Sequence, residues 1–350
     1  MAFINNNLLT QAHQESAYET AYQDDVLNRY ISIQDNHRHS IFTLHQKVMD
    51  LLTSQLDARL QECTSVVVFG SYARLDASRQ SDFDNLVLTT SERETSAKEV
   101  SNVLNRILAD LSIPLPNPNG VFSGGVYAVS GIEDGIGGVK DDYKCMSRRL
   151  LLLLESRPIF GVGVHNSVVE NLVTLYGRDV GDDPRKNYVF LLNDLIRYFR
   201  TICVNYHHTM ETETDHWPVR NIKLRHSRLV MYASLVAMLG VLSTYREKDK
   251  NDRLREFIRL TPLQRLHRAY LEVGDTGFYK VAGSYDVFLC FMNDPEARAS
   301  LKSLPYAQRY KSRDFAVLKA NSDALASELS RFFLDRRGLW SDRFYEYLLM

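Results

Sequence analysis

The sequence of 350 residues has few cysteines and no excess of charge of either sign. The four cysteines, at positions 63, 145, 203 and 290, lie far apart and lack the paired spacing of a zinc module or a disulfide framework. Lys and Arg number 42 against 43 Asp and Glu, which argues against an all-over basic surface for nucleic acid but leaves a local basic patch open. We expect a reducing, cytoplasmic compartment.

The sequence also predicts neither an export signal nor a membrane span. The first 15 residues lack a basic segment followed by an apolar core, so we expect no signal peptide. Residues 229–245 are nearly uncharged, but this segment is shorter than the roughly 20 residues that cross a bilayer, and it contains Ser, Gly, Thr and Tyr. We therefore expect a buried core helix there and no membrane span. The sequence has no internal repeat and no low-complexity tract.

Apolar periodicity and chain breakers predict strands and helices in the first half of the chain and helices in the second half. The predicted elements are a helix over 40–60, a buried strand over 65–69, a strand over 85–90, an amphipathic helix over 91–111, a third strand over 121–129, a buried helix over 148–156 and a long helix over 183–208. The Gly/Val/Asp-rich stretch over 161–184 is interpreted as a domain junction. A second Gly-Ser pair, at 283–284, is interpreted as a turn at the start of a helix.

One short stretch, FGSYARLDASRQSDFDNLVL, carries chemistry. Gly70 and Ser71 follow the predicted buried strand, where a residue without Cβ lets the backbone turn sharply and present N–H groups to a phosphate. Ten residues later come Asp82 and Asp84, which face the same side of an extended segment because side chains alternate, while Phe83 faces the core. Two carboxylates so placed can hold magnesium, which prefers hard oxygen ligands.

These residues resemble the GS-x10-DxD signature of the polymerase-β-like nucleotidyltransferase superfamily, particularly its minimal nucleotidyltransferases, and Ser81 before the first acid fits the same pattern. The resemblance implies an α+β fold, with a nucleotidyltransferase domain on a mixed sheet followed by a helical substrate-binding domain. It further implies an NTP or dNTP on Gly70 and Ser71, with Mg²⁺ or Mn²⁺ at Asp82 and Asp84. Leu75 stands where the family usually has Gly, a change that we expect to be tolerated.

The predicted division of the chain follows from this order of elements. An N-terminal helical arm is expected over residues 1–38, the nucleotidyltransferase domain over 39–165, and the helical domain with a C-terminal tail over 166–350. The active site is expected in the cleft between the last two, because ligand pockets favour domain interfaces.

A third carboxylate is the missing part of the pattern. Superfamily members that polymerise or adenylylate place one on a later strand, and the predicted strand over 121–129 contains none. The nearest substitutes are Glu133, Asp134, Asp141 and Asp142, of which Asp134 is our candidate metal ligand. If none of them serves, the protein either transfers slowly with two acids or only binds nucleotide.

Cationic candidates lie in the helical half. Arg197 and Arg200 recur with Asn193 along a polar stripe of the long helix, and Lys223 and Arg225 lie in a basic run. Binding of a triphosphate or a nucleic-acid acceptor and the formation of structural ion pairs explain these residues equally well.

The function that the resemblance implies is a template-independent nucleotidyltransferase of EC 2.7.7 type that moves a nucleoside monophosphate onto a hydroxyl. A nucleotidyltransferase of this chain length resembles enzymes of bacterial toxin-antitoxin and antiphage systems, such as the Hailong type. One set of candidate acceptors is the hydroxyls of the C-terminal tail, which could also prime an oligonucleotide: Ser341, Tyr345 and Tyr347. The alternative acceptors are a partner effector protein or an RNA such as tRNA. The competing hypothesis is a catalytically degenerate nucleotide-binding partner or antitoxin. A homo-oligomer stays possible.

Overall fold

The computed structural model describes residues 38–90, 94–116, 125–133, 136–137, 141–180, 187–212 and 217–349. Most of the predicted N-terminal arm therefore lies outside the described residues. The α-helices are α2 (Ala58–Cys63), α3 (Gly70–Arg74), α4 (Glu94–Asp110), α5 (Ser130–Glu133), α6 (Tyr143–Leu154), α7 (Val162–Tyr176), α8 (Val189–Thr212), α9 (Trp217–Lys223), α10 (Leu229–Leu242), α11 (Glu247–Ile258), α12 (Pro262–Glu272), α13 (Phe278–Asn293), α14 (Pro295–Lys302), α15 (Arg313–Leu334) and α16 (Asp342–Leu349). Two 3-10 helices, η1 (Gly177–Asp179) and η3 (Tyr306–Lys311), and a π-helical segment, η2 (Leu224–Arg228), complete this part of the chain. A further helix over residues 38–55 precedes α2.

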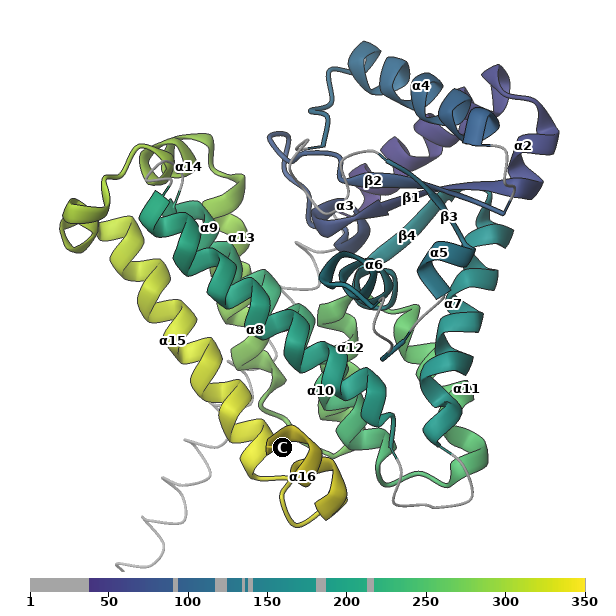
Figure 1. Cartoon of the computed structure of the whole chain (residues 1–350). Helices are drawn as coiled ribbons and strands as arrows, with labels where there is room; N and C mark the ends of the chain where they lie inside the picture. Colours follow the sequence, from purple (N-terminus) through teal and green to yellow (C-terminus); the bar gives the residue numbers. More distant parts are fainter. Residues whose placement is uncertain are drawn as a thin grey trace, which may run out of the picture.

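A four-stranded sheet forms the first half of the molecule (Figure 1). Its strands follow the order β3-β2-β1-β4. The central strand β1 (Thr64–Phe69) pairs antiparallel with β2 (Asn85–Thr89) and with β4 (Ser156–Phe160), whereas β3 (Val126–Ala128) runs parallel to β2. The sheet is mixed, as predicted, and β4 is the strand that the sequence pattern did not predict.

Both faces of β1 are buried, because helices cover the sheet on its two sides. Val66 and Val68 pack in one core with the helix over 38–55 and α4. Val67 and Phe69 pack in a second core with α6 and α7 that continues into the helical half. The uninterrupted β-branched run therefore has the composition expected of an interior strand.

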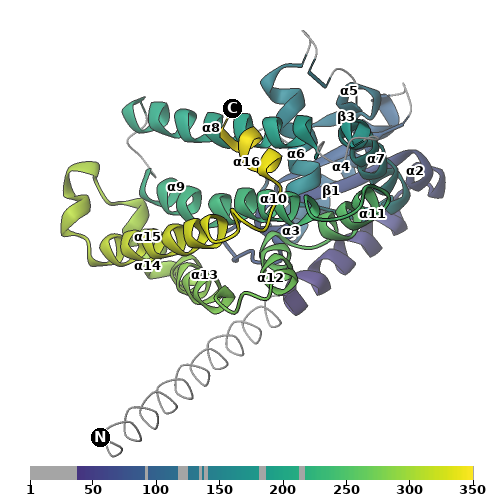
Figure 2. The same ribbon diagram turned by 90° about the horizontal axis from the view of Figure 1, so that it is seen from below.

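Helix α10 is the centre of the helical half. Its residues are almost all buried, and it packs most extensively on α12 and also on α8 and α15, which surround it in Figure 2. The prediction of a core helix here is confirmed. None of the helices in the described part of the chain combines the length and apolar character needed to span a membrane.

The structure bears on two sequence interpretations. Part of the stretch over 161–184 forms α7, on which Val164, Val168 and Leu172 recur at helical spacing and bury against the sheet. The predicted domain boundary at residue 165 thus falls inside a helix. The turn before α7 needs Gly161, whose φ is +60° and whose added Cβ would lie 1.8 Å from the Thr64 carbonyl oxygen. The Gly-Ser pair at 283–284 lies within α13 rather than at its start.

Candidate active site

The Gly-Ser turn and the acidic segment lie side by side. Gly70 directly follows β1 and begins α3 with a φ of +61°, and an added Cβ would lie 3.2 Å from the Asp84 carboxylate, so both conformation and space favour glycine. The Phe69 N–H donates to the Asp84 carbonyl at 2.9 Å, which joins the two halves of the motif. Ser71 is partly exposed beside them.

Leu75 occupies the position where the family pattern has glycine. It adopts the left-handed conformation with φ of 63° and ψ of 35°, and its side chain is fully buried. For a non-glycine residue this conformation costs roughly 1–2 kcal/mol, and the buried leucine side chain offsets a similar amount. The fold therefore accommodates this departure, as predicted.

The two acids differ in environment although they are one residue apart. Asp82 is exposed and Asp84 is partly buried, while Phe83 is fully buried and packs on Tyr72 with ring centroids 4.7 Å apart. Burial raises the pKa of Asp84 to about 6. Attraction to Arg228 and Lys223 lowers this pKa, whereas repulsion from Asp82 and Glu155 raises it. Ionised Asp84 is thus costly without a cation beside it.

The helical half closes a cleft over this motif. Lys223, Ser227, Arg228 and Arg298 line it opposite Gly70, Ser71, Asp82 and Asp84. Arg298 of α14 donates to the Ser78 hydroxyl at 2.7 Å and to the Gln80 carbonyl at 3.3 Å, and so holds the loop that leads to Asp82. The extra residue per turn in η2 alters which side chains of this helix face the cleft, as is frequent near functional sites.

The Gly-Ser turn and the two acids lie within a segment that matches a known domain family. Residues 53–118 match the family model of the Nucleotidyltransferase domain. The match includes all four motif residues, and it supports nucleotidyl transfer, an NTP substrate and a transferase activity in general. No curated protein matches the chain.

Such nucleotidyltransferase domains generally use divalent metals, and the acids present fit one. Asp82 and Asp84 face the cleft, and the raised pKa of Asp84 shows a carboxylate whose charge the protein alone offsets incompletely. Mg²⁺ suits a site with one or two carboxylates, because it retains water ligands and accepts phosphate oxygens. Among the residues that the structure describes, no three Asp, Glu, His or Cys side chains form a metal-binding group.

The predicted third acids lie elsewhere or outside the described residues. Asp141 pairs with the buried Arg149 at 2.6 Å, and Asp142 caps α6 by accepting from the Cys145 N–H at 2.7 Å. Neither lines the cleft. The side chain of Glu133 and the whole of Asp134 lie outside the described residues, so the proposed metal ligand Asp134 stays a prediction.

Glu155 is the acid that sequence reasoning missed. It lies between α6 and β4, buried, and its carboxylate joins Arg74 at 2.6 Å to Arg228 of the helical half. Burial would raise the pKa of Glu155, but the two arginines outweigh it and lower that pKa. The available signal was a single acid directly after the apolar run LLLLL.

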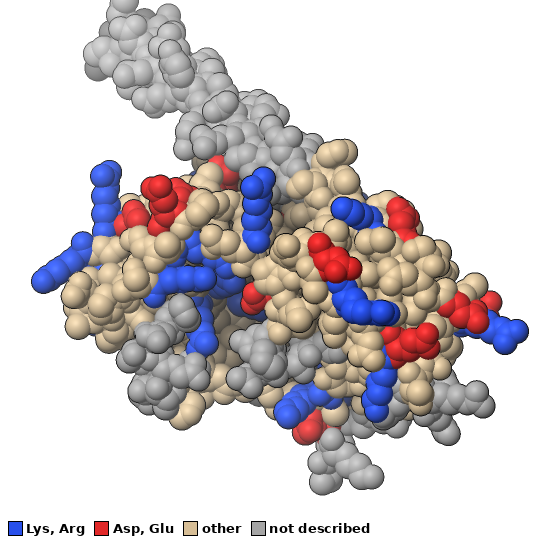
Figure 3. Space-filling view, turned by 90° about the horizontal axis from the view of Figure 1, so that it is seen from above, with Lys and Arg blue, Asp and Glu red and all other residues tan. Residues whose placement is uncertain are grey.

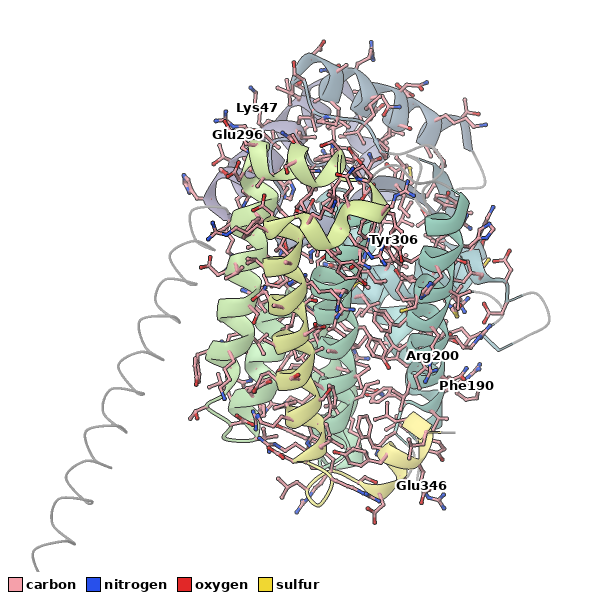
Figure 4. The ribbon with its side chains drawn as sticks, turned by 90° about the vertical axis from the view of Figure 1, so that its left-hand side faces the viewer. Lys47, Phe190, Arg200, Glu296, Tyr306 and Glu346 are labelled. Atoms are coloured by element: carbon pink, nitrogen blue, oxygen red, sulfur yellow. The ribbon has the colours of Figure 1, made fainter. Side chains whose placement is uncertain are left out.

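The four cationic side chains predicted to bind a triphosphate or an acceptor lie in different parts of the helical half. Of these four, Lys223 lines the cleft described here, where desolvation, with repulsion from Arg298 and other arginines, lowers its pKa to about 8. Arg225 instead bonds to Ser322 and Asp323 on α15. Arg197 pairs with Asp194 at 3.1 Å, and Arg200 is exposed on α8 (Figure 4).

The candidate acceptor hydroxyls lie on the tail, at the opposite end of the helical half from α14 (Figures 1 and 4). The Tyr345 hydroxyl donates to the Phe333 carbonyl at 2.8 Å. The Ser341 N–H donates to the Ser243 hydroxyl, and Tyr347 is partly buried against the core. As packed, this tail does not reach the cleft of its own chain.

Proposed function

We propose that the protein is a metal-dependent, template-independent nucleotidyltransferase of EC 2.7.7 type that moves a nucleoside monophosphate from an NTP or dNTP onto a hydroxyl. One observation carries the proposal: the cleft sets two carboxylates and a Gly-Ser turn against Lys223, Arg228 and Arg298. This is the charge distribution that a metal-bound triphosphate requires.

The reaction needs positioning and charge more than covalent help from the protein. The acceptor oxygen bonds to the α-phosphorus, the bond from that phosphorus to the bridging oxygen breaks, and pyrophosphate leaves while the hydroxyl proton passes to solvent. Asp82 and Asp84 would hold Mg²⁺ or Mn²⁺, which when bound lowers the pKa of the hydroxyl and neutralises phosphate charge. The Ser71 hydroxyl, Lys223 and Arg298 would bind phosphate oxygens and orient them.

The setting proposed with this activity is a bacterial cytoplasm, in phage defence or a toxin-antitoxin pair. It rests on the resemblance of the motif to minimal nucleotidyltransferases and on the cysteine usage. The acceptor would be an oligonucleotide, a partner effector protein or the tail of a second copy of the chain.

A second candidate is a nucleotide-binding protein without transfer activity. The observation that favours it is the engagement of other acids in structural contacts: Asp141 with Arg149, Asp142 with the Cys145 N–H, and Asp76, a third acid of the cleft lining, with Arg74 and Tyr285. It would bind nucleotide through the same residues.

The test incubates purified protein with Mg²⁺ and each α-labelled NTP and dNTP. We expect incorporation by wild type, none by Asp82→Ala with Asp84→Ala, and wild-type incorporation by Asp110→Ala, a matched change of an exposed acid on α4. Equal incorporation by the double variant and wild type would refute the catalytic assignment. Nucleotide binding without incorporation in wild type would favour the second candidate.

A further inference from the structure

A second, larger cavity of about 420 Å³ lies between α9, η3 and α15. We call it the aromatic pocket. The residues that matter in its lining are Trp217, Asn221, Tyr306, Arg309, Tyr310 and Phe315. Its volume is within the range of small-molecule sites, and the nucleotidyl transfer proposed above makes no use of it.

The rings of the pocket are arranged as a floor and a rim. Trp217 is buried and meets Tyr306 and Phe315 edge-on, at centroid distances of 5.0 and 5.1 Å. Tyr306 is 42% exposed and Tyr310 is 81% exposed. Rings this exposed contribute little to the stability of the fold and offer flat faces on which a base can stack.

Positive charge accompanies these rings. The Arg309 guanidinium lies 3.8 Å from the Tyr306 centroid and 4.3 Å from that of Tyr310. Residues 301–313 contain four Lys or Arg and no acid, and Asp323 in the pocket is already paired with Arg225 and Lys319. Lys and Arg gather around the hollow between the two halves of the molecule in Figure 3.

A single helical path connects the pocket with the cleft. Asn221 and Arg225 line the pocket, whereas Lys223 and Ser227, on the same α9–η2 helix, line the cleft. The two sites are therefore separated by about one helix diameter, 10–12 Å with side chains. Tyr306 also lies at the Glu296 end of the helical half and away from Glu346 of the tail (Figure 4). An extended chain of a few nucleotides can span this distance.

We propose that the aromatic pocket binds the bases of a single-stranded oligonucleotide whose 3′ hydroxyl is the acceptor in the cleft. This assignment rests on the nucleotidyl transfer proposed above and names its acceptor class. The 3′ oxygen bonds to the α-phosphorus of the triphosphate, pyrophosphate leaves and the proton passes to solvent. Stacking on Tyr306 and Tyr310 tolerates any base, and Arg309 pairs with the backbone.

Fluorescence anisotropy with labelled single-stranded 12-mers of RNA and of DNA, without nucleotide, tests the pocket. We expect Tyr310→Ala to raise the Kd at least about fivefold, and Arg309→Ala to reduce the slope of log affinity against log salt by about 1. Arg337→Ala, an exposed arginine at the other end of α15, should change neither. Thermal melts should be unchanged, since Tyr310 is so exposed.

The readouts separate this proposal from that of the cleft. Oligonucleotide binding that is unchanged in Asp82→Asn with Asp84→Asn but is weakened at least about fivefold in Tyr310→Ala supports the pocket. Unchanged oligonucleotide affinity in both pocket variants overturns it. If the wild-type protein transfers nucleotide to a protein but binds neither RNA nor DNA, the pocket proposal is overturned and the cleft proposal stands. If the wild-type protein also fails to bind nucleotide, both proposals are refuted.

Discussion

Asp84 should make the protein less stable at neutral pH than it would be with a neutral side chain. The structure places this carboxylate partly buried, with Asp82 and Glu155 close enough to repel it. Burial and repulsion raise its pKa from 3.8 to about 6. We therefore predict that Asp84→Asn abolishes nucleotide incorporation and at the same time raises the free energy of unfolding at pH 7.5.

The size of the gain follows from linkage. Between pH 3.8 and about 6 the folded state binds more protons than the unfolded state, so the free energy of unfolding falls as pH rises through this window. At about 1.4 kcal/mol per pH unit the upper bound is about 3 kcal/mol, and because the cleft is open to solvent we expect about 1–3 kcal/mol. For a chain of this length that is roughly 2–4 °C in Tm.

The assay is a series of thermal and urea unfolding curves from pH 4.5 to 8 on wild type, Asp84→Asn and Asp82→Asn. The gain of Asp84→Asn should be largest above pH 7 and shrink toward pH 4.5, and the exposed Asp82 should give a smaller effect at every pH. Mg²⁺ should raise the Tm of wild type more than that of Asp84→Asn. A gain that is absent, or equal at both ends of the pH range, would refute the reasoning.

Three further predictions concern the turn, the buried bridge and the tail. Gly70→Ala should lower the free energy of unfolding in urea by about 1–2 kcal/mol because of its positive φ, whereas Gly131→Ala, with no atom within 4 Å of the added Cβ, should not destabilise. Glu155→Gln should lower the free energy of unfolding by about 1–3 kcal/mol, since Arg228 loses its carboxylate partner whereas Arg74 keeps Asp76 at 3.1 Å; an unchanged free energy of unfolding would contradict the bridge. If the tail is an acceptor, intact mass should show nucleotide additions that Tyr345→Phe or Tyr347→Phe removes and that increase with protein concentration.

The sequence predicted the site where local geometry determines it. The β-branched run before Gly70, the Gly-Ser turn and the alternation of Asp82, Phe83 and Asp84 each depend on residues within one strand length, and the structure confirms all three. The mixed sheet and the helical second half were predicted on the same basis.

What the sequence did not predict depends on pairing across long distances. The segment SRPIF contains proline, which argues against an interior strand, yet β4 forms because it is an edge strand beside β1. Glu155, next to it, comes close to Arg228 only after the helical half docks on the sheet. The division of Lys223 and Arg225 between two cavities depends on the π-helical register of η2, which periodicity of 3.6 cannot indicate.

The charges around the cleft explain why metal and nucleotide should bind together rather than singly. Four acids and four bases lie on it or are bonded to its lining, namely Asp76, Asp82, Asp84, Glu155, Arg74, Lys223, Arg228 and Arg298. With this balance a triphosphate that binds alone is repelled by Asp82 and Asp84, and a metal cation that binds alone is repelled by the arginines and Lys223. A metal and a triphosphate that enter together place each charge beside its opposite, so each should raise the affinity of the other by the same factor.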